Sequence, residues 1–189
     1  MKFAIKTQAL MGERRCGDWG HHEEFENGSQ VAILIDVTGH GELAALLVDK
    51  IKNLMVFEES KTVENYLDEL NDICSGTVGC AAGVLIIDMN NKLHFSAMGN
   101  VLCHYFLNGV SKSFVSKDGM LGHRKGSYFT QSVKLMENDV LLLHTDGIKN
   151  LNNKRLLILE HENIDAIVHR AVRDFGKMTD DMGCLGVKI

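Results

Sequence analysis

The stretch from Val31 to Gly41, which reads VAILIDVTGHG, restricts the possible fold more than any other part of the sequence. Five consecutive apolar residues lead into Asp36, and two glycines follow shortly after it. A continuous apolar run is typical of a central β-strand that is covered on both faces. The run therefore predicts a buried strand, Val31–Val37, which ends in a charged residue and a turn with little side-chain bulk.

The length and composition predict one domain, residues 1–189, with an ordinary globular core. Apolar residues make up 45% of the 189 residues, which is enough for a single core. No apolar run approaches the roughly 18 residues that a membrane-spanning helix needs. The first residues do not have the pattern of a signal peptide, so we expect a cytoplasmic protein with no membrane partner.

The charge pattern argues against nucleic acid as a partner. The formal net charge is −5, and the sequence has no block of Lys and Arg that could bind phosphates along a strand. The five cysteines are odd in number and lack a CxxC spacing. We therefore expect reduced, mostly buried thiols instead of a disulfide framework or a structural zinc site.

The pattern of apolar residues predicts three helices. The first, over 42–57, has Leu43, Leu46, Leu47, Ile51, Leu54 and Met55 at helical spacing. The second follows Thr62 as a cap, and the third runs from Asn163, as its cap, to Gly176.

Strands are predicted in most of the remaining chain, whereas the polar segment 12–29, with its tract His21–Glu24, predicts a loop or hairpin. The chain contains no proline, so its turns depend on Gly, Asn and Asp. The expected strands are 1–10, 31–37, 79–89, 92–97, 102–107, 110–115, 127–135, 140–145 and 184–189. Many strands joined as hairpins, with helices in two blocks, favour an α+β fold of two packed sheets with the helices outside.

Four aspartates stand close to the ends of predicted strands. Asp36 ends the buried strand described above, Asp146 follows the apolar run 140–145 in the same way, and Asp18 and Asp180 lie next to glycine-containing or polar turns. Each one alone is explained as well by a turn, because Asp before Gly is a common turn pair. If the strand ends meet at one sheet edge, the carboxylates repel one another, and the cluster would have raised pKa values or hold a cation. An all-oxygen ligand set favours Mg²⁺ or Mn²⁺ over zinc.

The motifs around these aspartates resemble those of a known family. Asp36-Val-Thr-Gly-His-Gly41, Thr145-Asp-Gly-Ile148 and Asp180-Asp-Met182 are similar to the three signatures of metal-dependent (type 2C, PPM) protein serine/threonine phosphatases. Within that family the chain resembles the bacterial SpoIIE-like branch. The segments Gly17-Asp-Trp19 and Met98-Gly-Asn-Val101 resemble those of its short stand-alone members, the RsbX type. The resemblance covers nearly the whole chain.

This resemblance implies a fold and a set of metal ligands. The implied fold is a four-layer αββα sandwich of two mainly antiparallel sheets flanked by helices, in agreement with the pattern above. The implied cofactor is a pair of Mn²⁺ or Mg²⁺ ions, held by Asp36, Asp146 and Asp180 with help from the Val37 carbonyl. Asp181 is the alternative ligand to Asp180, or the ligand of a third ion.

The resemblance also implies the reaction, in which a water molecule that bridges the two metal ions attacks phosphorus directly. Asp18 would hold metal-bound water by hydrogen bonds. Arg14 or Arg15 stands where eukaryotic relatives have an arginine that binds the substrate phosphate, although an ordinary surface arginine is the favoured explanation. His40 could donate a proton to the leaving oxygen, or could simply be a turn residue. Gly183 departs from the family pattern, which usually has Thr there.

These observations predict a protein serine/threonine phosphatase that acts on a phosphorylated regulatory protein. The resemblance implies that the partner is a STAS-domain protein of a partner-switching or stressosome pathway, and we expect a monomer or weak dimer. One alternative is a catalytically inactive phosphatase-like module that binds a phosphorylated regulator. Another is a metal-dependent hydrolase for small phosphorylated metabolites.

Overall fold

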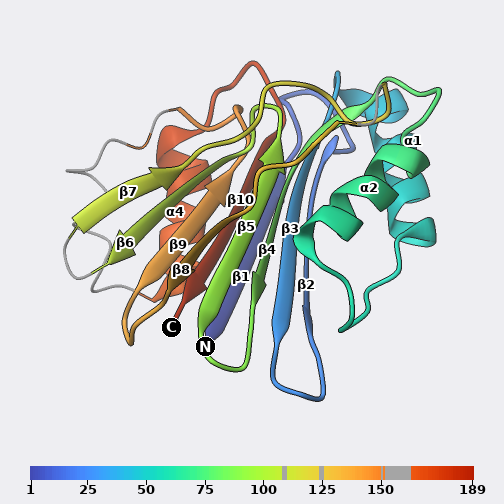
Figure 1. Ribbon diagram of the computed structural model, residues 1–189. Helices are drawn as coiled ribbons and strands as arrows, with labels where there is room; N and C mark the ends of the chain where they lie inside the picture. Colours follow the sequence, from blue (N-terminus) through green and yellow to red (C-terminus); the bar gives the residue numbers. More distant parts are fainter. Residues whose placement is uncertain (108–109, 124–125, 150, 152–162) are drawn as a thin grey trace.

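The computed structural model describes residues 1–107, 110–123, 126–149, 151 and 163–189, and in these residues it has two five-stranded sheets and three helices (Figure 1). All hydrogen-bonded neighbours within the two sheets are antiparallel. The first sheet has the order β1 (Lys2–Gln8), β10 (Met182–Lys188), β9 (Val140–His144), β6 (Leu102–Leu107) and β7 (Val110–Phe114). The second has the order β2 (Asp18–Glu24), β3 (Gln30–Val37), β4 (Cys80–Ile87), β5 (Lys92–Met98) and β8 (Gln131–Lys134).

The helices cover the outer faces of the two sheets, so that the molecule has four layers (Figure 1). Helices α1 (Gly41–Leu54) and α2 (Val63–Ile73) pack on the second sheet, and α4 (Ile164–Phe175) packs on the first. Three apolar clusters fill the spaces between successive layers. This arrangement confirms the predicted α+β fold of two mainly antiparallel sheets flanked by helices.

Strand β3 shows why the sequence has an uninterrupted apolar run. Successive side chains of a strand point to opposite faces of the sheet. Val31, Ile33 and Ile35 pack in the cluster under α1 and α2, whereas Ala32 and Leu34 pack in the cluster between the two sheets. Asp36 follows Leu34 on the same face of the strand, so its side chain lies at the edge of the space between the sheets.

Helices α2 and α4 begin at their predicted caps, Thr62 and Asn163, but α1 buries a different face from the one we expected. Leu43, Leu46 and Leu54 are exposed, at 77%, 52% and 53%. The buried residues of α1 include Ala44, Ala45, Leu47, Val48 and Ile51. The small side chains of the two alanines let the helix lie close to the sheet. In the described residues, no helix combines the length and hydrophobicity that crossing a membrane requires.

The segment 12–29, which we predicted as a loop or hairpin, contains the regular edge strand β2. The tract His21–Glu24 lies within this strand and is paired with β3, so our expectation of a polar loop there was wrong. The ring of His22 stacks on Phe3 with 3.7 Å between centroids, and His21 lies 4.2 Å from the ring of Phe57. Aromatic stacking therefore partly covers histidines that the sequence pattern alone marks as polar.

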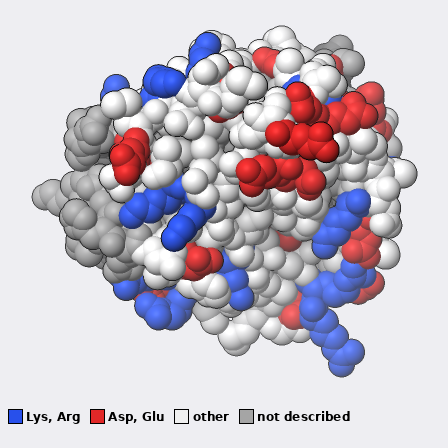
Figure 2. All heavy atoms as spheres, turned by 90° about the horizontal axis from the view of Figure 1, so that it is seen from below, with Lys and Arg blue, Asp and Glu red and all other residues white. Residues whose placement is uncertain are grey.

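Both termini lie at one end of the sandwich, and the loops that follow β3 and β9 lie at the other end (Figure 1). Figure 2 shows the molecule from the end that carries the termini. Acidic side chains gather in one part of this face, and basic side chains form separate groups.

Helix α2 begins with a capping box whose contribution to stability can be measured. The Thr62 hydroxyl accepts a hydrogen bond from the Asn65 backbone N–H at 3.3 Å, and the Asn65 side chain accepts one from the Thr62 N–H at 2.9 Å. Thr62→Ala removes the first bond and should lower the free energy of unfolding by about 1 kcal/mol in urea titrations. Ser60→Ala, at a nearby exposed position, is the control, and equal midpoints for the two variants would contradict the cap.

Candidate functional site: a carboxylate pocket at the sheet edge

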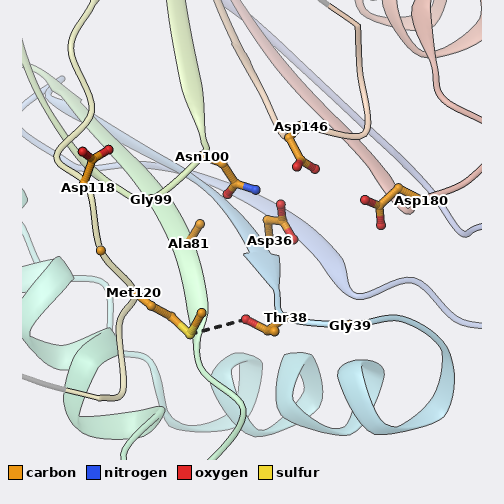
Figure 3. Close-up of a pocket in the computed structure, with 11 residues that line it drawn as sticks. Asp36, Thr38, Gly39, Ala81, Gly99, Asn100, Asp118, Met120, Asp146 and Asp180 are labelled. Carbon is orange, nitrogen blue, oxygen red and sulfur yellow. Dashed lines mark hydrogen bonds between the residues drawn. The ribbon is translucent and has the colours of Figure 1, made fainter.

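Three of the four predicted aspartates meet in one cavity of about 500 Å³, which we call the carboxylate pocket. Asp36 comes from the end of β3, Asp146 lies two residues after β9, and Asp180 lies two residues before β10. Figure 3 shows that their carboxylates point toward one another. Three separate segments of the chain therefore supply the acidic groups of this pocket.

The pairing of the strands explains why these groups converge. Strands β9 and β10 are neighbours in the first sheet, with His144 opposite Cys184, so the residues just beyond this pair lie at the same edge. Strand β3 belongs to the second sheet and contacts β10 across the space between the sheets. The carboxylates therefore meet where the two sheets face each other at one end of the sandwich.

Gly147 allows the segments that carry Asp146 and Asp180 to approach closely. A Cβ atom on Gly147 would lie 1.7 Å from the backbone oxygen of Asp181, a distance that no side chain can occupy. The Lys177 N–H donates to the carbonyl of Gly147 at 2.7 Å. The glycine after Asp146 therefore permits a close backbone contact that any side chain would prevent.

Burial and neighbouring charges shift the ionisation of Asp36. Burial, and after it the negative charges of Asp146 and Asp180, raise the pKa of Asp36 to about 7, although a hydrogen bond from the Asn100 side chain opposes the shift. The ionised carboxylate is therefore destabilised in this pocket unless positive charge is placed beside it.

Asp18 lies next to the pocket, paired with Asp36 in the register of β2 and β3. It is only 4% exposed, and its carboxylate accepts a hydrogen bond of 2.7 Å from the Thr145 hydroxyl. Burial, and after it the charge of Asp36, raises the pKa of Asp18 well above its ordinary value. The Gly183 N–H donates to the same Thr145 hydroxyl at 2.9 Å.

The position of Gly183 accounts for its departure from the family pattern. A Cβ atom there would lie 3.0 Å from an Asp18 carboxylate oxygen and 3.2 Å from the Thr145 methyl group. A threonine at 183 would crowd both groups, so the glycine fits the bond between Thr145 and Asp18.

Asp181 points away from the carboxylate pocket and has a structural role. One of its oxygens accepts a hydrogen bond from the Leu10 N–H and the other from the Gly17 N–H, both at 2.7 Å. These bonds tie the end of β1 and the loop before β2 to the start of β10. Its role as a metal ligand stays a prediction, as does that of the Val37 carbonyl.

The predicted substrate-binding residues are not part of the lining that the structure describes for the carboxylate pocket. Arg14 is exposed, and Arg15 pairs with Glu42 at 2.9 Å and also with Asp49. His40 stands at the N-cap position of α1 but its side chain makes no capping hydrogen bond; its Nδ1 atom lies 3.1 Å from a Glu13 carboxylate oxygen. Binding of substrate by Arg14 or His40 therefore stays a prediction.

One amide and one carboxylate side chain of the pocket were not among the predicted site residues. Asn100, which follows Gly99 after β5, donates to Asp36, and Asp118 lines the pocket on the side opposite Asp146 and Asp180 (Figure 3). Asp118 precedes a glycine, so the Asp-Gly pattern that identified Asp146 could also have found it.

The donor atoms of the pocket fit a hard divalent cation. They are carboxylate and amide oxygens. A cation placed among them offsets the cost of burying the ionised Asp36 carboxylate, the same cost that raises its pKa. Within the described part of the chain, no three His, Cys, Asp or Glu side chains already form a compact ligand group. The pocket thus brings the carboxylates to one cavity without closing them around an ion.

Comparisons with known proteins agree with this geometry. The SpoIIE family model (stage II sporulation protein E) matches residues 26–189. No curated protein sequence matches the chain. A solved chain described under the bacterial stressosome, a modular system adapted to control secondary messenger signalling, has a TM-score of 0.87 and 21% identity, with 97% of each chain covered.

Two further solved structures share the fold. RsbX in complex with magnesium has a TM-score of 0.83 and 19% identity, with 97% of this chain and 92% of that chain covered. The PP2C phosphatase domain of the cell-fate determinant SpoIIE from Bacillus subtilis, solved with a fragment of its regulatory domain, has a TM-score of 0.76 and 19% identity. That match covers 98% of this chain and 62% of the other. At these identities the likeness establishes the fold.

The raised pKa of Asp36 predicts a pH dependence of stability in metal-free protein. Between the ordinary pKa of Asp, near 4, and about 7, the folded state keeps a proton that the unfolded state has released. The free energy of unfolding should therefore fall as pH rises through this window. Asp36→Asn removes the contribution of Asp36 to this fall, and should be more stable than the native protein at pH 8 by roughly 1–3 kcal/mol in EDTA.

Urea titrations at pH 4.5 and pH 8 test this prediction. The two proteins should differ little at the lower pH, and Asp72→Asn, at an exposed position, should follow the native protein at both. A native protein whose stability does not change between these pH values would contradict the electrostatic account.

Gly147→Ala tests the close approach of the two segments. The added methyl group collides with the Asp181 carbonyl, so the free energy of unfolding should fall by about 3 kcal/mol or more. Gly126→Ala is the control, because its Cβ would meet only the flexible end of Met98 at 3.4 Å. The unfolding temperatures of the two variants are compared with that of the native protein. A Gly147→Ala protein as stable as the native protein would show that the segments of Gly147 and Asp181 lie farther apart than described.

Proposed function

Since the chain belongs to the SpoIIE family of PP2C-type phosphatases, we propose that it hydrolyses phosphoserine and phosphothreonine on a regulatory protein. The observation that carries this proposal is the convergence of Asp36, Asp146 and Asp180 from three strand ends into one cavity. A chain without metal chemistry has no physical reason to bring three repelling carboxylates together, because their mutual repulsion destabilises the fold.

In this proposal Asp36, Asp146 and Asp180 hold two Mn²⁺ or Mg²⁺ ions, with the Val37 carbonyl as a further ligand. Bound in this way, two divalent ions lower the pKa of water to make a nucleophile, and they neutralise charge on a transferring phosphoryl group. The chain's own contribution is to keep the three carboxylates in place at the ends of paired strands, where backbone hydrogen bonds limit their movement.

Neighbouring residues orient the acidic groups. Asn100 donates to Asp36 and so fixes which of its oxygens is available to a ligand. Asp18, held by the hydroxyl of Thr145, lies beside Asp36 and would position solvent there by hydrogen bonding. Gly39 lines the open side of the pocket without a side chain, which leaves room for the phosphorylated residue of a substrate protein.

The class of substrate follows from the family and from its structural relatives. Likeness to RsbX and to a stressosome structure supports a regulatory phosphoprotein as substrate. We take a phosphorylated STAS-domain protein as the partner, consistent with the motifs of the RsbX type in the sequence.

Hydrolysis of p-nitrophenyl phosphate across a Mn²⁺ titration tests the function. Asp146→Asn removes a carboxylate ligand, and metal catalysis supplies several kcal/mol of transition-state stabilisation. The turnover rate should therefore fall by at least about a hundredfold. Asp72→Asn, which makes the same chemical change at an exposed position outside the pocket, should keep native turnover.

Calorimetry of Mn²⁺ binding separates the remaining outcomes. Weak or absent binding by Asp146→Asn, together with binding by the native protein, supports the assigned ligand set. Native protein that binds Mn²⁺ but hydrolyses neither p-nitrophenyl phosphate nor a phosphoprotein would be the inactive binding module. Faster hydrolysis of phosphorylated metabolites than of phosphoprotein would mean that the substrates are small metabolites and not proteins.

A further inference from the structure

A second cavity, of about 610 Å³, shares Asp146 with the carboxylate pocket. Its charged lining residues besides Asp146 are Lys149, Lys177 and Asp174, and the rest of its described lining is apolar. We call this cavity the lysine pocket. Because one carboxylate borders both cavities, a molecule seated in the carboxylate pocket has the lysine pocket as its immediate neighbour.

Backbone pairing fixes the two lysines relative to each other. Ile148 and Gly176 form an antiparallel bridge, and the Lys149 N–H donates to the Phe175 carbonyl at 2.8 Å. In this register Lys149 and Lys177 are diagonal neighbours on one face of the paired segments, a relation in which residues lie about 7–8 Å apart and their Cβ atoms somewhat closer. Two ammonium groups at that spacing can both reach one carboxylate or phosphate group.

Among the residues that the structure describes, the other charges that line the lysine pocket leave it basic when the metal site is filled. Asp174 is paired with Arg173, with distances of 2.6 and 2.9 Å between the guanidinium nitrogens and the carboxylate oxygens. In the proposed function Asp146 is neutralised by a bound cation. The two lysine side chains then set the sign of the local potential.

The carboxylate pocket itself has no Lys or Arg in its described lining, and Arg15 is engaged by Glu42 and Asp49. A substrate protein that places its phosphate among the carboxylates therefore meets these lysines through the residues that flank its phosphorylated side chain. An extended residue spans about 3.3–3.6 Å, so residues about one to three positions away come within reach. An acidic side chain there is attracted and a basic one is repelled.

We propose that the lysine pocket selects substrate proteins with an aspartate or glutamate about one to three residues from the phosphorylated serine or threonine. Lys149 and Lys177 bind that carboxylate and so orient the substrate segment over Asp146. The inference rests on the proposed function, because it takes the phosphate to lie in the carboxylate pocket. It adds a preference within the substrate class that the family assignment does not contain.

Binding of phosphopeptide analogues to the full-length protein tests the preference. Fluorescent peptides of equal length carry a phosphonate analogue of phosphoserine, which is not hydrolysed, and either Asp or Asn two residues from it on each side. In the presence of Mn²⁺, fluorescence anisotropy should show about three- to tenfold tighter binding of the Asp peptide, because each exposed ion pair contributes up to about fivefold. This advantage should shrink with added KCl.

Charge reversal makes the test independent of any loss of stability. The double variant Lys149→Glu, Lys177→Glu should prefer a peptide with Lys at the same positions over the Asp peptide, a gain that an unfolded protein cannot give. The control Lys2→Glu, Lys92→Glu changes the net charge by the same amount at exposed positions near the other end of the sandwich, and should keep the native preference.

Equal binding of the Asp and Asn peptides by the native protein would overturn the inference, and so would a native preference that survives charge reversal. Hydrolysis of p-nitrophenyl phosphate tests the proposed function separately. A native protein that prefers the Asp peptide but hydrolyses nothing would contradict the catalytic proposal and leave the recognition by Lys149 and Lys177 in place.

Discussion

Repulsion among carboxylates is the constraint on which the rest of this structure depends. Asp18 and Asp36 are buried or half-buried, they lie side by side in paired strands, and Asp36 also faces Asp146 and Asp180. Water cannot screen these charges fully, so the fold must hold them together with interactions that are formed elsewhere. Those interactions are the apolar cluster between the sheets and the hydrogen bonds of the strands that end at the pocket.

The sandwich architecture gives this constraint a simple solution. A residue at the end of a strand has its backbone fixed by its neighbours while its side chain projects beyond the apolar layer. Because β3 lies in one sheet and β9 and β10 lie in the other, their carboxylates approach from two sides. The Thr145 hydroxyl joins the two sides, since it donates to Asp18 of the second sheet and accepts from Gly183 of the first.

Local patterns in the sequence predicted the parts of the molecule that local forces determine. The apolar run of β3, the caps of α2 and α4, and the aspartates at strand ends all depend on residues within a few positions of one another. Strand β2 was missed because aromatic partners distant in sequence, Phe3 and Phe57, cover its histidines. The buried face of α1 was misjudged because leucines lie on both sides of that helix, whereas its two alanines are both buried.

The acidic residues also divide into those that local patterns identify and those whose roles depend on partners distant in sequence. Asp36 and Asp146 could be found from their strand-then-glycine pattern, and Asp118 could have been found in the same way. The pattern could not separate Asp180 from Asp181, because the difference lies in partners far along the chain. Asp181 is committed to the amides of Leu10 and Gly17, more than 160 residues away, and this leaves Asp180 to face the pocket.

The bonds of Asp181 have a consequence for the order of events during synthesis. Strand β10 lies between β1 and β9, and Asp181 fastens the start of β10 to the segment that precedes β2. The first strand of the chain therefore has no partner in its sheet until the last one has left the ribosome. Contacts between such distant segments form late in folding. A nascent chain can assemble the second sheet early, but its carboxylate pocket is complete only when β10 has joined β1 and β9.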